Sequence, residues 1–344
     1  MKLEVQRRTL RFAEPLTTSY GTLSERELLE VSLSGEEGPT GYGEAAPLEP
    51  YDGVSIERAE AALAGYRTVL AEADADMNGA QLLEACRRAD DLPQALAAVD
   101  LALWDRAGRA RGLPLSALIA EDPARQVPVN APLSALGRAE VAEQTAAALA
   151  AGYTCVKLKV GVGDDAGRVA AARAAGGPEL ELRLDANGAW DVEQAVRTID
   201  ALAPAGLELV EEPVHGLHAV REVRDRVAVR VAIDETAAEH GALGAGVADA
   251  VCLKVSRCGG ISATIAAAVL VRTSGAEPYL ASAYDGPLGV AAALHIAAAL
   301  ASRGPVPACG LATLGLFAGI EDPLAPERGQ IPVPTGAGLG VEPL

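Results

Sequence analysis

Short apolar segments alternate with longer Ala-rich segments through the second half of the chain. Five of the apolar segments are rich in leucine or β-branched residues and each ends in a charged residue, at positions 159, 185, 211, 234 and 254; they read CVKLK, LRLD, LELVE, VRVAID and VCLK. The segments between them repeat alanine and leucine at helical spacing. This alternation is typical of parallel strands joined by helices.

The alternation extends to both sides of these five strands. A strand is expected at 127–131 with a helix at 137–151, and a seventh strand at 278–282 follows a helix at 261–274. The eighth strand is the least regular, at 307–311. We therefore predict an α/β fold with a closed (β/α)8 barrel, in which the carboxyl ends of the strands meet at one mouth.

The first part of the chain has a different pattern. Segments 3–12, 28–34 and 41–45 alternate as antiparallel strands do, and 55–73 and 92–111 have helical spacing. The polar segment TTSYGTLSERE at 17–27 is too long for a tight hairpin, and we expect a functional loop there. On this loop Tyr20 and Arg26 are candidate ligand contacts.

These patterns divide the chain into three parts. We expect an α+β domain at 1–126, the barrel with the active site at 127–319, and a tail at 320–344 that returns to the first domain. The net charge of −18, the low aromatic content of 3% and the lack of a basic cluster argue against nucleic acid and anionic membranes as partners. With no long apolar run and no signal peptide, a soluble, cytoplasmic protein is expected, with its five cysteines reduced and mostly buried.

Lysine is rare in this chain. The sequence has 29 lysines and arginines together, but lysine occurs only at positions 2, 157, 159 and 254. A partly buried lysine can lose its proton and act as a base, whereas arginine cannot. Lys157, Lys159 and Lys254 are therefore candidates for proton transfer.

Three carboxylates share the barrel mouth with these lysines. Asp185, Glu211 and Asp234 end successive strands, and an all-oxygen set of this kind suits Mg²⁺, with Mn²⁺ as a substitute. A divalent cation stabilises the enediolate that forms when a proton is removed next to a carboxylate. Lys159 is the candidate base, with its pKa lowered by Lys157 on the same strand face, and Lys254 lies across the mouth. A small carboxylate substrate is the expected partner.

At these residues the sequence resembles the enolase superfamily, and within it the muconate-cycloisomerase-like (muconate lactonizing enzyme) branch. The similar stretches are KLK, LDANGAW, VEEP, IDE and LKVSRCGG in the barrel, with GYGEAAP and AAVDLALWDRAGRARGLPL before it. The resemblance implies a capping domain, completed by the tail, over a modified barrel. It implies the same metal ligands and lysines, and places Asn187, Glu212 and Glu235 beside the ligands. Members of this family often form dimers or octamers, so a homo-oligomer is compatible with it.

Within the branch, the sequence points to more than one reaction. The PACGLAT run is similar to o-succinylbenzoate synthases of menaquinone biosynthesis, whereas GYGEAAPLEPYDG resembles dipeptide epimerases. Strand eight has no Asp-x-Asp pair of the kind with which epimerases hold the substrate amine. The synthase, a lyase, is the preferred interpretation; dipeptide epimerase, N-acylamino acid racemase and muconate cycloisomerase are the alternatives. A metal or metabolite binder without catalysis is the alternative of another class.

Substrate identity is expected to depend on the residues around the mouth. Tyr51, Ser282 and Asp285 are candidate contacts in addition to those on the 17–27 segment. His215 and His218 follow the fourth strand closely enough to approach a metal, but solvated loop positions are the preferred interpretation because the carboxylates already satisfy a hard cation.

Overall fold

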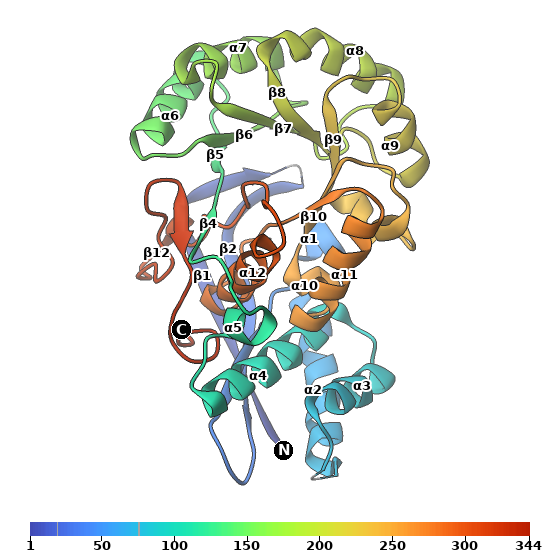
Figure 1. Cartoon of the computed structure of the whole chain (residues 1–344), viewed down its shortest axis with the longest axis vertical. Helices are drawn as coiled ribbons and strands as arrows, with labels where there is room; N and C mark the ends of the chain where they lie inside the picture. Colours follow the sequence, from blue (N-terminus) through green and yellow to red (C-terminus); the bar gives the residue numbers. More distant parts are fainter. Residues whose placement is uncertain (19, 75) are drawn as a thin grey trace.

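An antiparallel sheet and a curled parallel sheet organise the fold (Figure 1). The computed structural model of the protein describes residues 1–18, 20–74 and 76–344. Within these residues the parallel sheet has the order β11-β10-β9-β8-β7-β6-β5, and every neighbouring pair in it is parallel. The predicted fold class, a modified (β/α)8 barrel with an N-terminal α+β domain, is confirmed.

Six strands of the parallel sheet lie close to the predicted apolar runs, whereas the first was predicted at 127–131 and begins only at Ala131. The carboxyl ends of β6 to β10 carry the charged residues singled out in the sequence, or are followed directly by them. The strands are β5 (Ala131–Leu133), β6 (Cys155–Lys159), β7 (Glu181–Asp185), β8 (Leu207–Glu211), β9 (Arg230–Ile233), β10 (Ala250–Leu253) and β11 (Glu277–Leu280).

Helices cover the outside of this sheet, most clearly at the top of Figure 1, where α6 to α9 arch over β6 to β9. Side chains of Asp164 and Asp191 cap α7 and α8 by accepting hydrogen bonds from backbone N–H groups in the first turn. The α-helices are α6 (Arg138–Ala150), α7 (Asp165–Gly176), α8 (Val192–Leu202), α9 (Leu217–Arg224), α10 (Val255–Cys258), α11 (Ile261–Thr273) and α12 (Pro287–Ala301). Short 3₁₀ helices are η1 (Ala203–Ala205), η2 (Glu235–Ala238), η3 (Ala242–Gly244) and η4 (Leu314–Leu316).

The barrel closes without a regular eighth strand. The segment predicted as strand eight forms isolated parallel bridges, from Cys309 to Val129 on one side and from Gly310 to Ala281 on the other. The N–H of Gly310 donates to the carbonyl of Leu280 at 2.9 Å. Pro307, which has no N–H, interrupts any longer ladder in this segment. The segment therefore occupies the predicted place with fewer hydrogen bonds than a strand would have.

The N-terminal domain consists of the sheet β12-β1-β2-β3 and the helices packed on it. The α-helices are amphipathic or Ala-rich, and α3 begins with a capping box between Asn78 and Gln81. The elements are β1 (Lys2–Thr18), β2 (Gly21–Ser34), β3 (Gly41–Ala45), α1 (Glu49–Asp52), α2 (Ile56–Glu72), α3 (Gly79–Ala89), α4 (Pro93–Arg111), α5 (Leu115–Ile119) and β12 (Phe317–Ala318).

The prediction of a long polar loop at 17–27 is wrong. The strands β1 and β2 continue to Thr18 and from Gly21, and Leu16 pairs with Leu23 near the hairpin end. Both leucines pack against the main hydrophobic core, which explains why strand pairing persists through so polar a stretch. Ser19, which also belongs to the predicted loop, lies outside the described residues.

The C-terminal tail returns to the N-terminal domain, as expected. Its backbone pairs with the end of α4 through the hydrogen bond from the N–H of Gly338 to the carbonyl of Leu113, and the Leu339 N–H donates to Asp105 Oδ1 at 2.7 Å. A short antiparallel ladder joins β13 (Gln330–Pro332) to β4 (Gln126–Pro128) at the start of the barrel. The domain limits near 126 and 319 stay predictions.

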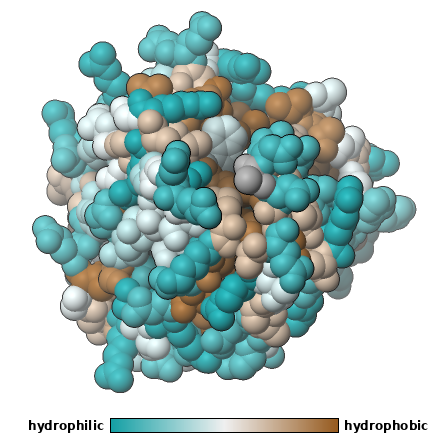
Figure 2. All heavy atoms as spheres, turned by 90° about the horizontal axis from the view of Figure 1, so that it is seen from below, coloured by the Kyte–Doolittle hydropathy of each residue, from teal (hydrophilic) through white to brown (hydrophobic). Residues whose placement is uncertain are grey.

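Two hydrophobic cores support the fold. One lies within the N-terminal domain between its sheet and α2 to α4, and the other fills the barrel and reaches Leu10, Phe12 and Leu28 of the capping sheet. All five cysteines are free, and four of them are buried. Figure 2 shows a mostly hydrophilic face with small, separate hydrophobic patches. Within the described ranges, no helix combines the length and the apolar character needed to cross a membrane.

Candidate active site

Alternation along β6 points two lysines into the barrel. Val156 and Leu158 are fully buried against the surrounding helices, so Lys157 and Lys159 face the interior. In the next strand Asp185 is the register partner of Lys159, and Glu211 of β8 is the partner of Asp185. The register of these parallel strands thus brings the charged residues to one level at the mouth.

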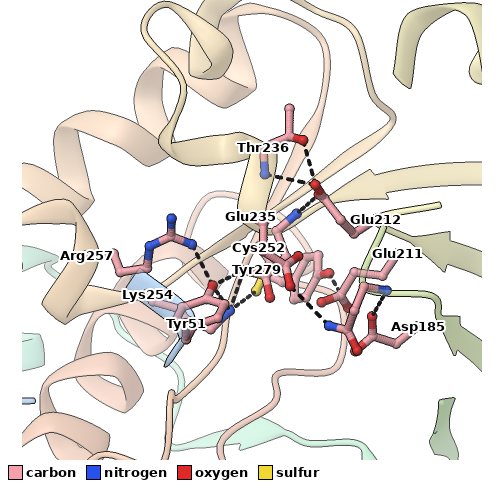
Figure 3. Close-up of polar contacts among 12 residues, drawn as sticks. Tyr51, Asp185, Glu211, Glu212, Glu235, Thr236, Cys252, Lys254, Arg257 and Tyr279 are labelled. Carbon is pink, nitrogen blue, oxygen red and sulfur yellow. Dashed lines mark hydrogen bonds and ion pairs between the residues drawn. The ribbon is translucent and has the colours of Figure 1, made fainter. Parts of the chain in front are cut away.

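Lys157 joins two of the carboxylates. Its Nζ lies 3.0 Å from Asp185 Oδ2 and donates to Glu211 Oε1 at 2.9 Å. The other oxygen of the wholly buried Glu211 accepts a hydrogen bond of 2.8 Å from the hydroxyl of Tyr279 on β11. Figure 3 shows Tyr279 and Asp185 on either side of the Glu211 carboxylate.

The third carboxylate, Asp234, is held from the opposite side. Lys254 forms an ion pair with its Oδ1, and the Tyr51 hydroxyl donates to the same oxygen at 2.8 Å. Lys254 and Arg257 also donate to the Tyr51 hydroxyl, at 2.9 and 2.6 Å. Tyr51 belongs to α1 of the N-terminal domain, so this domain completes the barrel mouth (Figure 3).

Three polar residues that the resemblance placed beside the ligands, Asn187, Glu212 and Glu235, form hydrogen bonds near the carboxylates. The Asn187 amide donates to Glu235 Oε1 at 3.1 Å, and the backbone N–H of Asp234 donates to Glu212 Oε2 at 2.8 Å. Asn187 and Glu212 have positive φ values of 44° and 41°; Asn187 is the second residue after β7 and Glu212 the first after β8. Such conformations are uncommon for residues other than glycine and concentrate at functional sites.

His215 packs beside this cluster, with a ring nitrogen within 4.8 Å of carboxylate oxygens of Glu212 and Glu235. Its ring lies over Gly188, where an added Cβ would approach Nε2 to 2.1 Å, so position 188 requires glycine. Its Nδ1 lies 2.9 Å from Glu212 Oε1, and its side chain is 55% exposed. His218 lies on the exposed side of α9. Both histidines thus occupy solvated positions at the rim.

The two lysines of β6 differ in electrostatic environment. Burial lowers the pKa of Lys159 from its ordinary value; Lys157 adds to this effect, and Asp185 and Glu235 oppose it. For Lys157, burial acts in the same direction, but the adjacent Asp185 and Glu211 outweigh it and raise the pKa. Lys159 is therefore the lysine whose neutral form is more accessible. Desolvation lowers the pKa of Lys159 more than the Lys157 charge does, although the prediction from the sequence relied on that charge.

One cavity of about 270 Å³ connects these groups. Charged, aromatic, polar and aliphatic side chains all contribute to its walls, from both domains. The lining residues are Leu16, Thr18, Tyr20, Tyr51, Asn130, Pro132, Leu133, Ser134, Lys157, Lys159, Asp185, Asn187, Asp234, Lys254, Ala281, Ser282, Ala283, Tyr284, Gly310, Ala312, Thr313 and Leu316.

Arg26, expected to contact a ligand, has a different place. It is 3% exposed, and its guanidinium donates to the backbone carbonyls of Ala46, Pro47 and Ala283. These hydrogen bonds occupy the guanidinium and connect β2 to the wall of the cavity. Arg26 therefore supports the wall instead of lining it.

Asp285 is likewise buried behind the wall, at 2% exposure. Its backbone N–H donates to Ser282 Oγ at 2.8 Å, while Ser282 itself lines the cavity. Glu44 lies nearby and accepts a hydrogen bond of 2.7 Å from the N–H of Gly286. Of the five candidate substrate contacts, Tyr20, Tyr51 and Ser282 thus line the cavity, whereas Arg26 and Asp285 lie behind it.

The residues at the mouth fit a divalent cation. Oxygens of Asp185 and Glu211 already converge on one cation, the Lys157 ammonium, and Asp234 is paired with the Lys254 ammonium. The ammonium groups stand in for positive charge that carboxylate oxygens of this kind can instead supply to Mg²⁺. Cys252 Sγ also lies within 4.8 Å of oxygens of Glu211 and Asp234, but burial raises the pKa of this thiol and so disfavours the thiolate, which leaves hard oxygen donors as the charged groups of the set.

Sequence reasoning missed three residues of this site. Tyr279 binds Glu211, Arg257 binds Tyr51, and Thr236 donates to Glu212 through both its N–H and its hydroxyl. Arg257 lies within the LKVSRCGG stretch and Tyr279 within the predicted seventh strand, but their partners could not be predicted from the sequence.

Comparisons with known proteins agree with this arrangement. Residues 140–344 match the family described as enolase C-terminal domain-like, and residues 2–120 match the N-terminal domain of the mandelate racemase / muconate lactonizing enzyme family. The chain is 41% identical over 218 residues to o-succinylbenzoate synthase of Thermobifida fusca, a match that spans 60% of this chain and 66%, just under two thirds, of that protein.

Two further proteins are similar over more of their length. Muconate cycloisomerase 1 of Rhodococcus opacus is 30% identical over 338 residues, which cover 93% of this chain and 90% of that protein. The crystal structure of a dipeptide epimerase from Enterococcus faecalis, complexed with Mg and the dipeptide L-Leu-L-Tyr, superposes with a TM-score of 0.89 at 27% identity, covering 98% of both chains.

Proposed function

The chain belongs to the mandelate racemase / muconate lactonizing enzyme family of the enolase superfamily, and from this premise we propose that it is an o-succinylbenzoate synthase. The reaction removes a proton next to the carboxylate of 2-succinyl-6-hydroxycyclohexadiene carboxylate and releases the ring hydroxyl group as water, so that the ring becomes aromatic. The enzyme is of the dehydratase or isomerase type found among its relatives.

Asp185, Glu211 and Asp234 would hold Mg²⁺. When bound, this cation supplies positive charge to the substrate carboxylate as negative charge develops on its oxygens. Lys157 and Lys254 flank these carboxylates and provide further positive charge at the same place. Preorganised charge of this kind is usually the largest contribution to catalysis.

Lys159 is the proposed base. Burial lowers its pKa, so the neutral amine is easier to reach than in water, and its side chain lines the cavity. The amine takes the proton from the carbon that carries the carboxylate. The resulting ammonium then protonates the leaving hydroxyl group, so that water and the aromatic product form and Lys159 returns to its neutral state.

The charge distribution of the cavity is the observation that favours the synthase. Among the described lining residues the only carboxylates are Asp185 and Asp234, both assigned to the cation. A dipeptide would bring a free ammonium group to the far end of the cavity, where the described residues offer no anion to pair with it. The remaining walls combine aliphatic residues with Asn130, Ser134 and Thr313, whose amide and hydroxyl groups can donate hydrogen bonds to the carboxylate at the end of the succinyl arm.

A second candidate reaction is racemisation of an N-acylamino acid. Lys159 and Lys254 both line the cavity, and each approaches the carboxylates from its own side. Two lysines placed in this way can remove and return a proton on opposite faces of one carbon. An N-acyl group has no charge to compensate, so the lining residues accept it as well as they accept the cyclohexadiene ring.

The test is turnover of 2-succinyl-6-hydroxycyclohexadiene carboxylate by the purified protein with Mg²⁺, followed by the ultraviolet change on aromatisation. We expect a kcat within the usual enzymatic range of about 1 to 1000 s⁻¹, abolished by a chelator and restored by added Mg²⁺. Intact Mg²⁺ binding without turnover would contradict the synthase. Incorporation of solvent deuterium into N-acylamino acids, dipeptides or muconate would then identify the alternative reaction, and a lack of exchange in all of them would favour a non-catalytic binder.

A further inference from the structure

A column of polar side chains runs through the barrel beneath the mouth. Tyr279, which is 1% exposed, is its middle member: its hydroxyl donates to Glu211 Oε2 at 2.8 Å, and its ring faces the Arg183 guanidinium with Cζ 4.9 Å from the ring centroid. Barrel interiors are normally filled with branched aliphatic side chains. A buried tyrosine between a guanidinium and a carboxylate therefore requires a specific reason.

The lower end of the column is fixed. Arg183 is fully buried and donates two hydrogen bonds of 2.9 Å to Glu208, one to each carboxylate oxygen, and one of 2.8 Å to the carbonyl of Ala308. A bidentate pair of this kind has little freedom to rotate. The guanidinium under the ring restricts where Tyr279 can lie, so the position of the phenol oxygen is set from below.

The upper end of the column determines how Glu211 presents its second oxygen. The Tyr279 hydroxyl donates to Oε2 of Glu211. Oε1 accepts from the Lys157 ammonium, which also binds Asp185 Oδ2. In the described part of the chain, Tyr279 is the only hydrogen-bond donor to Oε2. Without the phenol, Lys157 alone among the described residues would restrain rotation of the carboxylate about its terminal bond, and a cation that displaces Lys157 would meet oxygens that are no longer fixed.

We propose that Tyr279 is a positioning residue of the metal site, which fixes the Glu211 carboxylate so that Oε1 faces the point on which Asp185 also converges. The inference rests on the proposed function, since it takes Glu211 as a ligand of a divalent cation. Groups that orient metal ligands in this way typically change metal affinity or activity by about 10- to 100-fold when removed.

The test compares Tyr279→Phe with a matched control, Tyr66→Phe. Tyr66 is also fully buried and also donates its hydroxyl to one acceptor, the carbonyl of Asp90, but it lies in the core of the N-terminal domain. Binding of Mg²⁺ and of Mn²⁺ alone is measured by calorimetry on the purified full-length variants. The Mg²⁺ concentration for half-maximal turnover gives a second, independent reading.

We expect Tyr279→Phe to weaken binding of both cations by about 10- to 100-fold. The half-maximal Mg²⁺ concentration should rise accordingly, while kcat at saturating Mg²⁺ stays within a few-fold. Tyr66→Phe should leave both cation affinities unchanged. Equal affinities in wild type and Tyr279→Phe would overturn the positioning role, whereas a wild-type protein that binds neither cation would overturn the proposed function itself.

The double variant Tyr279→Phe/Glu211→Gln covers the case in which the single variant does not fold. In Glu211→Gln a neutral amide replaces the carboxylate. The double variant therefore lacks the charged oxygen, Oε2, that loses its hydrogen-bond donor in Tyr279→Phe. Recovery of soluble protein would therefore support action of Tyr279 through Glu211. Failure of the double variant to recover, when Glu211→Gln alone is soluble, would contradict it, because the phenol would then serve the fold by another contact.

Discussion

The Lys157 ammonium donates to Glu211 Oε1 at 2.9 Å, and it thereby occupies a place between carboxylates where a metal cation would be attracted. Since Asp185 lies within 3.0 Å of the same nitrogen, removal of the ammonium would leave two neighbouring carboxylates without their counter-charge. The ammonium and a divalent cation therefore compete for these oxygens when no substrate is bound.

This competition predicts the behaviour of Lys157→Met. In the metal-free protein we expect a loss of unfolding free energy of about 3 kcal/mol, because one partner of a largely buried ion pair is removed. Mg²⁺ should bind about tenfold more tightly or better, while turnover falls. Thermal unfolding with and without Mg²⁺, together with calorimetry, measures both effects. Lys2→Met is the control, since Lys2 is 72% exposed and pairs with the exposed Glu4; an Mg²⁺ affinity that fell in Lys157→Met would contradict the competition.

His295 predicts how stability changes in acid. Its imidazole is fully buried, where Nδ1 accepts from the Ser116 N–H and Nε2 lies 3.0 Å from the Leu339 carbonyl oxygen; burial lowers its pKa to about 4. The unfolded chain takes up this proton near pH 6.5 and the folded chain only near pH 4, so the contribution of His295 is present above pH 6.5 and is lost as the pH falls between these values.

The measurement is the difference in unfolding free energy between wild type and His295→Gln. We expect wild type to be the more stable at pH 7, and the difference to shrink by about 3 kcal/mol between pH 7 and pH 4. His240→Gln, at an exposed position, serves as the control and should show no such trend. A constant difference for His295→Gln across this range would show that the imidazole is not kept neutral by its surroundings.

Glu44 predicts the opposite trend at higher pH. It is 2% exposed, its Oε2 has no hydrogen-bond partner in the described part of the chain, and burial, together with the neighbouring Asp285, raises its pKa to about 8. In the unfolded chain the carboxyl ionises near pH 4.5, so folding favours the protonated form. Its contribution to stability is therefore complete below pH 4.5 and is lost as the pH rises to about 8.

Glu44→Gln removes this ionisation while keeping the shape of the side chain. Relative to wild type, the unfolding free energy of the variant should rise by about 4 kcal/mol between pH 5 and pH 8. The exposed Glu36→Gln provides the matched control and should follow wild type at every pH. The explanation fails if Glu44→Gln and wild type keep the same difference throughout.

The sequence was sufficient for those features that depend on local periodicity. Lys159, Asp185 and Glu211 each end a strand of a parallel series, and the ends of such strands meet at one edge, so their meeting could be predicted without a structure. The contact between Tyr279 and Glu211 could not, because it depends on which side chains face each other across the closed barrel.

The errors have a common physical cause. Arg26 was expected to lie on a solvated loop because its neighbours are polar, yet the guanidinium meets backbone carbonyls that come from the end of β3 and beyond. Leu16 and Leu23 carry the apolar signal that extends the hairpin, but they are too few to outweigh the polar residues around them in the sequence. The first feature depends on contacts between distant segments, and the second on packing of the two leucines against the main hydrophobic core; the local pattern reports neither.

The central claim is that Lys159 removes the proton next to a carboxylate held at this mouth. It is tested most directly by turnover of 2-succinyl-6-hydroxycyclohexadiene carboxylate with Lys159→Arg, compared with wild type and with Lys2→Arg at matched Mg²⁺ saturation. Arginine keeps the positive charge but cannot become a neutral base, so turnover should fall by at least about 100-fold while Mg²⁺ affinity stays within a few-fold. Turnover by Lys159→Arg close to that of wild type would contradict the claim.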